Sequence, residues 1–194
     1  METRPAGNRT CLYNTAQLEL VIDAMSQQAA GLLGTSSRVK VVGILRRGAP
    51  LAAMLHQRLV RLLPQVELSL MNLQIKRYAD DLTLLHPKTQ LTEDPELAAL
   101  DLSGMTVLVV DDVMYHGHSM LRAVEYLAQK QAAEIRTMVL VDRGAARLPV
   151  RSDIVGVRLD VAPSDIIECN VPPYEDELRI DLLQPQNQGA FTVY

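Results

Sequence analysis

Two adjacent aspartates, Asp111 and Asp112, follow an apolar run at residues 106–110 that has the composition of a buried strand. Carboxylates at the end of such a strand are costly to desolvate unless a ligand or a hydrogen-bond donor uses them. The chain then turns at Gly117, and a helix is predicted to begin near Ser119, so that its first-turn amides form an anion site. This grouping favours a ligand with both hydroxyl groups and a phosphate, such as a ribose 5-phosphate. The alternative is that the two carboxylates only cap the turn and the helix.

Charged residues also follow two other predicted strands. The run at residues 39–45 ends in Arg46-Arg47-Gly48, and the run at residues 135–141 ends in Asp142-Arg143-Gly144. In open sheets of parallel strands, ligands bind beyond the carboxyl ends of the strands. We therefore expect all three strand ends to contribute to one site.

The elements that must position these residues alternate between strands and helices. Asn14 is a predicted N-cap, because its side-chain oxygen can accept from a free amide of the first turn, and Gly31 or Gly34 can end the helix that follows. A second helix is predicted at residues 50–63 and a further strand within residues 66–75. Such alternation predicts an α/β fold with a central, mainly parallel sheet flanked by helices on both faces.

Other parts of the chain have a different character. We expect an irregular lead-in at residues 1–13, and a long charged insert at residues 76–103 of the kind that is usually functional or mobile. Short strands that form either a small cap or an extension of the sheet are expected at residues 154–159, 165–169 and 178–183. We treat the chain as a single domain with a core at about residues 14–160 and an extension at about residues 161–194.

Composition excludes several classes of function. The chain of 194 residues has a formal net charge of −4, so bulk charge does not hold it on nucleic acid. It has two cysteines, Cys11 and Cys169, and lacks the spacing of a disulfide framework or a structural zinc site. The N-terminus does not resemble a signal peptide, and no apolar run approaches the ~20 residues of a membrane helix. We expect a cytoplasmic protein without a membrane partner.

Several segments resemble type I phosphoribosyltransferases. Residues 107–119 (VLVVDDVMYHGHS) are similar to that family's phosphoribosyl-diphosphate binding motif, and residues 43–48 (GILRRG) to its pyrophosphate loop. Residues 78–83 (YADDLT) and 141–156 resemble the mobile loop and base-side region of one branch, the bifunctional pyrimidine-operon regulators and uracil phosphoribosyltransferases. The likeness extends over about residues 14–160. It implies the type I phosphoribosyltransferase fold with a small hood, and transfer of a phosphoribosyl group between phosphoribosyl diphosphate and a nucleobase, uracil or another pyrimidine.

The resemblance implies a role for each motif. Asp111 and Asp112 would hold the ribose hydroxyls, directly or through Mg²⁺ and water, and their charge would stabilise the oxocarbenium-like transition state. On the mobile loop, Arg77 or Lys76 would close over the leaving group and exclude water. The 5-phosphate would be wrapped by Tyr115, His116, Gly117, His118 and Ser119. The diphosphate would be bound by Arg46, Arg47 and Gly48.

The base-side segment is implied to run from Arg147 to Gly156, with Arg147 and Val155 as candidate contacts to the base. In purine-specific relatives, a carboxylate precedes the glycine turn and accepts a proton. Tyr115 stands at that position here, so the resemblance names no general base.

The chain departs from the family pattern at four phosphate-handling positions. His116 stands where threonine is usual, and Arg46 where threonine or serine is usual, while His118 and Ala79 replace arginines common in the branch. Ser119 keeps the hydroxyl of the usual threonine. Imidazole titrates near pH ~6.5, so donor affinity is expected to strengthen as the pH falls if both rings line the phosphate site. An alternative is therefore a protein of this fold that senses the donor or a nucleotide and turns over poorly.

RNA is a less favoured partner, although the resembled branch binds it. The arginines that make the second half of the core locally basic are Arg136, Arg143, Arg147, Arg151 and Arg158. We favour a solvated face beside a phosphate site, because the chain has no Trp and a single Phe to stack on bases. The acidic trio at residues 175–177 is likewise expected to form a solvated turn. By resemblance, the chain forms a homodimer or a larger homo-oligomer.

Overall fold

The computed structural model describes residues 6–75, 99–146 and 148–185. In this part of the chain, a five-stranded parallel sheet has the order β3-β2-β4-β5-β6. Its strands are β2 (Arg38–Ile44), β3 (Glu67–Leu73), β4 (Thr106–Met114), β5 (Glu134–Asp142) and β6 (Ile154–Arg158). The central strands are runs of apolar, mainly β-branched residues that are buried on both faces, as strands covered on two sides require. The predicted α/β fold with a parallel sheet is confirmed.

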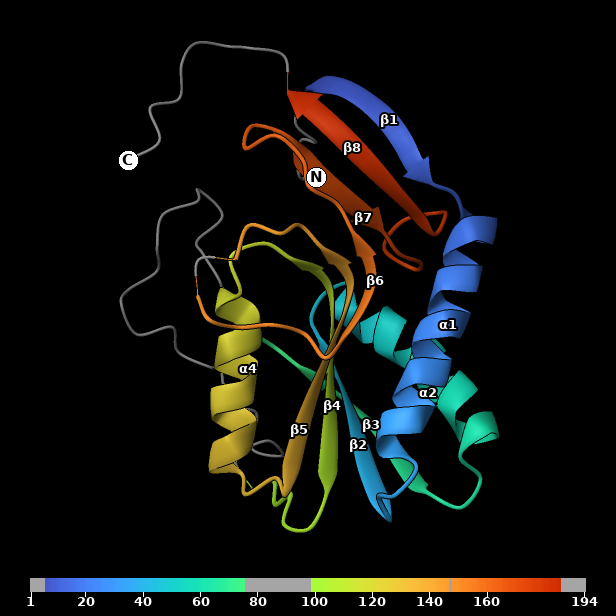
Figure 1. Ribbon diagram of the computed structural model, residues 1–194, viewed down its shortest axis with the longest axis vertical. Helices are drawn as coiled ribbons and strands as arrows, with labels where there is room; N and C mark the ends of the chain where they lie inside the picture. Colours follow the sequence, from blue (N-terminus) through green and yellow to red (C-terminus); the bar gives the residue numbers. More distant parts are fainter. Residues whose placement is uncertain (1–5, 76–98, 147, 186–194) are drawn as a thin grey trace.

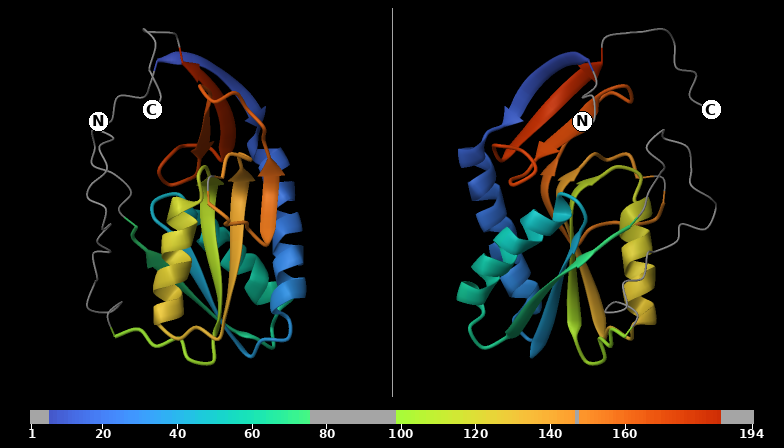
Figure 2. Two further views of the ribbon diagram at one scale, coloured as in Figure 1. Left: turned by 60° about the vertical axis from the view of Figure 1, so that its left-hand side comes forward. Right: turned by 180° about the vertical axis from the view of Figure 1, so that it is seen from behind.

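Helices cover both faces of this sheet, as the alternating pattern predicts. Helices α1 (Thr15–Leu33) and α2 (Gly48–Leu62) lie on one face, and α4 (His118–Gln129) lies on the other (Figures 1 and 2). The predicted cap of α1 is present as a reciprocal pair. The Asn14 side chain accepts a hydrogen bond from the Gln17 backbone N–H at 3.0 Å. The Gln17 side chain in turn accepts from the Asn14 backbone N–H, also at 3.0 Å.

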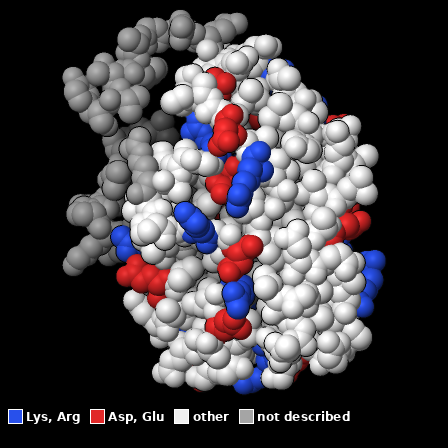
Figure 3. All heavy atoms as spheres, viewed as in Figure 1, with Lys and Arg blue, Asp and Glu red and all other residues white. Residues whose placement is uncertain are grey.

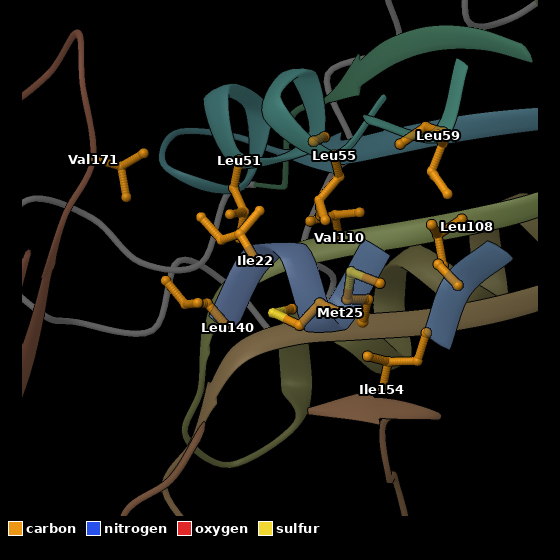
Figure 4. Close-up of a cluster of buried hydrophobic side chains, with 14 of the residues drawn as sticks. Ile22, Met25, Leu51, Leu55, Leu59, Leu108, Val110, Leu140, Ile154 and Val171 are labelled. Atoms are coloured by element: carbon orange, nitrogen blue, oxygen red, sulfur yellow. The ribbon is translucent and has the colours of Figure 1, made fainter. Parts of the chain in front are cut away.

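Two buried clusters attach the helices to the sheet. On one face, Ile22 of α1 and Leu55 of α2 belong to the same cluster as Leu108 of β4, and Figure 4 shows these side chains between the helices and the sheet. On the other face, Leu127 of α4 packs in a cluster with Val139 of β5. Because the strands are held from both sides, their carboxyl ends form a rigid rim for a site.

A second, antiparallel sheet lies beyond the carboxyl ends of the main strands (Figure 1). It consists of β1 (Gly7–Tyr13), β8 (Arg179–Pro185) and β7 (Ile166–Asn170), in the order β1-β8-β7, and we call it the hood. The expectation of an irregular lead-in is therefore wrong at residues 7–13, because these residues gain a pairing partner near the other end of the chain. The first predicted short C-terminal strand extends the main sheet as β6, and the other two join the hood.

The predicted insert falls mostly outside the described residues, because residues 76–98 are among those not described. Among the helices that are described, none is both long and apolar enough to cross a membrane.

Candidate functional site

The two predicted aspartates lie within β4 rather than after it. The strand was expected to end at Val110 but continues to Met114, because β5 pairs with it over its whole length while β2 pairs only as far as Val110. Asp111 is buried, and its Oδ1 accepts from the Asp112 backbone N–H at 3.0 Å. The carboxylate of Asp112 is half-buried and has no hydrogen bond or ion pair with any described residue. Asp112 is thus the carboxylate more available to a ligand.

The loop between β2 and α2 touches β4 at this point. A Cβ on Gly48 would lie 2.7 Å from the Val110 carbonyl oxygen and 3.1 Å from the Asp111 Cα, so only glycine fits there. The Leu45–Arg46 peptide bond in this loop is cis. Close packing at Gly48 brings the predicted diphosphate loop beside the aspartates.

Both arginines of this loop contact the hood turn between β7 and β8. The guanidinium of Arg46 lies 5.5 Å from the centre of the Tyr174 ring. Arg47 Nη2 lies 2.5 Å from Glu175 Oε1, and Arg47 Nε lies 3.1 and 3.2 Å from the two carboxylate oxygens. These hydrogen bonds raise the pKa of Arg47, although burial opposes them, and the charge of Asp112 acts in the same direction as Glu175. The expectation of a solvated acidic turn is wrong for Glu175, whose side chain is only 8% exposed.

The predicted phosphate turn leads directly from β4 into α4. Gly117 has a left-handed backbone with φ of +83° and, as the N-cap of the helix that begins at His118, makes no side-chain capping hydrogen bond. The first backbone hydrogen bond across the turn runs from Leu121 N–H to the Gly117 carbonyl, which leaves earlier amides of the helix available to an anion. The rings of His116 and His118 face each other edge to face, with centroids 6.3 Å apart. Ser119 is buried at the start of the helix.

Tyr115 faces the hood. Its hydroxyl accepts from the Ile167 backbone N–H at 2.9 Å and donates to the Ile167 carbonyl at 3.2 Å. The Arg143 guanidinium lies 5.0 Å from the centre of its ring. Burial raises the pKa of the Tyr115 hydroxyl. The structure thus gives this side chain hydrogen-bonding partners other than the phosphate that sequence comparison assigned to it.

Two of the five arginines of the predicted basic face form hydrogen bonds or ion pairs within the protein. Arg143 is buried, and its Nη2 donates to the backbone carbonyls of Ala162, Pro163 and Asp165 at 2.7, 3.1 and 2.9 Å. Arg136 forms ion pairs with carboxylates of its own neighbourhood. The prediction of a solvated face is therefore wrong for Arg143. Figure 3 shows basic and acidic side chains side by side on the face that it presents, without a continuous basic field.

The remaining predicted site residues lie apart from this group or are not described. Val155 is in β6, level with Val139 of β5, and packs against the cluster beneath α4. Arg147, Arg77, Lys76 and Ala79 lie outside the described residues.

Sequence reasoning missed Tyr174 and Glu175 as neighbours of the site. Arg47 and Glu175 are 128 positions apart, and no local pattern pairs them. The one available signal was an acidic residue two positions after a pair of prolines, between two predicted strands, which marks a tight turn without naming its partner.

Comparison with known proteins gives a consistent result. The family model described as the phosphoribosyl transferase domain matches residues 9–177. A relative named "Bifunctional protein PyrR" from Haemophilus ducreyi is 32% identical over 181 residues, which covers 91% of this chain and 97% of that protein. A protein of the same name from Haemophilus influenzae is 35% identical over 79% of each chain.

Solved structures show a similar fold at low sequence identity. The hypoxanthine phosphoribosyltransferase from Trypanosoma cruzi, in complex with the product IMP, aligns with a TM-score of 0.71 at 16% identity. The alignment covers 94% of this chain and 98% of that one.

Proposed function

The chain belongs to the phosphoribosyl transferase family, and on that premise we propose that it moves a phosphoribosyl group between phosphoribosyl diphosphate and a pyrimidine base such as uracil. One observation supports this above the others. The aspartates of β4, the left-handed turn at Gly117 and the arginine loop held at Gly48 gather at one end of the parallel sheet. A sugar with two hydroxyls, a 5-phosphate and a 1-diphosphate has groups that complement all three.

In this proposal each part has one task. Asp111 and Asp112 accept from the ribose 2- and 3-hydroxyls, and their charge stabilises the oxocarbenium-like transition state. The amides at the start of α4, with His116 and Ser119 around Gly117, bind the 5-phosphate. Arg46, Arg47 and the Gly48 backbone bind the diphosphate.

The donor groups at this end of the sheet fit a Mg²⁺ ion that is shared with the substrate. Among the described residues, no group of three or more His, Cys, Asp or Glu side chains is placed to hold a metal ion by itself. Mg²⁺ is commonly held by one or two carboxylates, waters and substrate phosphates. Asp112, which has no hydrogen bond or ion pair with a described residue, and Asp111 would hold it, directly or through water. When bound, Mg²⁺ would neutralise charge on the leaving diphosphate.

The remaining parts of the proposal rest on sequence resemblance. Arg77 or Lys76 closes over the leaving group, and the segment that includes Arg147 and Val155 faces the base. We also propose that the chain is one domain, works in the cytoplasm and forms a homodimer or larger homo-oligomer.

A second candidate function is a sensor of the donor or of a nucleotide that turns over poorly. The observation that favours it is the pair of imidazole rings that flank Gly117 in the chain, with centroids 6.3 Å apart. RNA binding is a third candidate. It has less support, because Arg136 and Arg143 are engaged by carboxylates and backbone carbonyls of the protein itself.

A paired assay tests these functions. The protein is mixed with Mg²⁺, phosphoribosyl diphosphate and uracil, and pyrophosphate release is measured; the same donor and UMP are tested for a shift in thermal unfolding. Release of pyrophosphate with uracil supports the enzyme. A thermal shift without release supports the sensor. Neither response, together with RNA binding that weakens steeply with salt, contradicts both.

A further inference from the structure

The hood turn between β7 and β8 reaches into the arginine loop of the core. Residues 171–178 supply both Tyr174, under the Arg46 guanidinium, and Glu175, which binds Arg47. The turn thereby joins the second sheet of the molecule to the loop that we assign to the diphosphate. Of the two contacts, the Arg47–Glu175 pair consists of hydrogen bonds, which fix the orientation of the guanidinium.

Glu175 is held firmly on its own side of the pair. Its Oε2 accepts from the Val171 backbone N–H at 2.8 Å, and its side chain is 8% exposed. A carboxylate in this position cannot turn away to water when a ligand arrives. Its orientation is set by the turn, and it therefore sets the orientation of the guanidinium that it binds.

Glu175 uses only one edge of the Arg47 guanidinium. Every hydrogen bond that Arg47 makes with a described residue comes from Nε or Nη2. Nη1 and the edge that it shares with Nη2 remain available for a second anion. Guanidinium groups bind phosphates in this two-pronged way, and an arginine held by a carboxylate on one edge loses less freedom when the other edge binds.

We propose that Glu175 is a positioning residue for the diphosphate: it holds Arg47 by the Nε–Nη2 edge so that the Nη1–Nη2 edge is presented to the diphosphate group. This inference rests on the proposed function. It assigns to the hood a part in donor binding through a residue 128 positions from the arginine that it orients.

The opposite role, in which Glu175 competes with diphosphate for Arg47, is disfavoured by burial. Competition requires Arg47 and Glu175 to separate. The Glu175 carboxylate, which is only 8% exposed, would then lose the charge of Arg47. Breaking one side of a buried ion pair is strongly unfavourable, because the buried carboxylate loses its oppositely charged partner without gaining hydration. The pair is therefore expected to persist when the diphosphate binds.

The two roles predict opposite signs for one substitution. In Glu175→Gln, the neutral amide keeps the size of the side chain but loses the charged hydrogen bonds that fix the guanidinium. We expect calorimetric titration with Mg²⁺ present to show affinities for phosphoribosyl diphosphate and pyrophosphate that are about 10-fold to 100-fold weaker, by analogy with the loss caused by removing a residue that orients a metal-binding side chain. Affinity for UMP, which has the 5-phosphate but no diphosphate, is expected to stay within about threefold, because Arg47 is not assigned to that phosphate. Tighter binding of pyrophosphate would overturn the inference in favour of competition.

Two further measurements separate positioning from a general structural effect. Glu168→Gln removes a carboxylate from the Arg9–Glu168 ion pair in the same hood, whose contacts are 2.7 and 3.0 Å, and is expected to leave all three affinities unchanged. In an Arg47→Lys background, where no second guanidinium edge exists, Glu175→Gln is expected to have no additional effect on pyrophosphate binding.

The outcomes are distinct. If Glu175→Gln weakens UMP and pyrophosphate binding equally, Glu175 has only a structural role. The same conclusion follows if Glu175→Gln weakens pyrophosphate binding as much in the Arg47→Lys background as in the wild type. If the wild-type protein binds none of the three probes, the proposed function fails and this inference fails with it. If the wild type binds them and Glu175→Gln binds them equally well, only this inference fails.

Discussion

At the scale of single residues, Asp111 and Asp112 are neighbours in β4 with different surroundings. The Asp111 carboxylate is buried and accepts from a backbone amide, whereas the Asp112 carboxylate is half-buried and has no hydrogen bond or ion pair with a described residue. A group without a protein partner is available to substrate, and a group that accepts from the backbone also supports the fold. The two side chains should therefore differ in what their removal costs.

We predict that Asp112→Asn lowers kcat/KM about 10²-fold to 10³-fold, the loss typical of one group that stabilises transition-state charge, with little change in stability. Asp111→Asn is expected to reduce activity and also to lower the free energy of unfolding by about 1–2 kcal/mol, because a charged acceptor is lost from a buried site. Pyrophosphate release and urea unfolding of both variants give the comparison. Equal destabilisation by the two substitutions would contradict the division of roles.

The Gly117 turn gives a second prediction at this scale. With φ of +83° and a Cβ that would meet the Val150 side chain at 3.4 Å, Gly117→Ala should cost about 1–2 kcal/mol of stability. It should also weaken UMP binding, because the strained turn misdirects the first amides of α4.

Gly31→Ala is the matched control. Nothing lies within 4 Å of its added Cβ, and alanine there should stabilise α1 by about 0.5–1 kcal/mol. Thermal unfolding and UMP titration check both variants, and an unaltered affinity in Gly117→Ala would count against the turn as the phosphate site.

Individual residues also show where sequence reasoning reaches its limit. The type and neighbourhood of Asp111, Asp112 and Gly117 predict a ligand site, because the chemistry is carried by a short continuous stretch. Arg143 looks equally functional in sequence, yet it is buried and donates to backbone carbonyls of the segment that leads to β7. An arginine that binds phosphate and one that binds carbonyls have the same local sequence signal, and only the distant partner distinguishes them.

At the scale of elements, the hydrophobic pattern predicts the strands and helices that pack against elements nearby in the sequence. It misses a strand that forms only because a distant part of the chain pairs with it. Strands β2, β4 and β5 each contain an uninterrupted apolar stretch, at residues 41–44, 107–110 and 138–141, and α1 has a capping residue at the predicted position. Strand β1 has no comparable signal, since its residues alternate irregularly between exposed and half-buried. It is a strand because β8 offers a free edge, and that edge is formed by the last described part of the chain.

The junction between β5 and β6 yields a prediction on pH. Asp153 Oδ2 accepts from the backbone N–H and hydroxyl of Thr137 at 2.8 and 3.1 Å, and Oδ1 accepts from Arg136 at 3.2 Å. Burial raises the pKa of Asp153, but these hydrogen bonds outweigh it and hold the pKa below its usual value. A carboxylate with a depressed pKa adds stability above its unfolded pKa, and this contribution is lost as the pH falls through the folded pKa.

We therefore expect Asp153→Asn to lower the free energy of unfolding by about 1–2 kcal/mol at pH 7. The difference from wild type should begin to shrink below pH ~4, where the carboxyl group of the unfolded chain takes up a proton, and should be lost as the pH falls through the lower folded pKa. Urea unfolding at pH 7 and at pH ~3 measures both differences. The exposed Glu67→Gln serves as the control that should change neither. A difference between wild type and Asp153→Asn that is the same at both pH values would contradict the ionic role of Asp153.

At the scale of the whole molecule, the hood and the core are distinct sheets that share one buried cluster, to which Ile167 and Ile180 of the hood and Ile22 and Leu108 of the core belong. Tyr115 reaches from the end of β4 to both backbone groups of Ile167 in β7, which is the edge strand of the hood. Because its partners belong to the edge strand, Tyr115 satisfies hydrogen-bonding groups that no neighbouring strand covers. The hydroxyl thus contributes to holding the hood over the carboxyl ends of the main sheet, where the site lies.

Removal of this hydroxyl should loosen the hood before it unfolds the core. In Tyr115→Phe, the N–H and carbonyl of Ile167 lose their partner, at a cost of about 1–3 kcal/mol for groups kept from water. Since β1, β8 and β7 form one hydrogen-bonded sheet, the cost should appear as faster amide hydrogen exchange throughout residues 7–13, 166–170 and 179–185, while β2 and β4 keep their protection. Tyr13→Phe is the matched control, because the Tyr13 hydroxyl makes no hydrogen bond with the described residues. A uniform increase in exchange across both sheets would mean that hood and core open as one unit, and the hydroxyl would then have no separate role in holding the hood over the site.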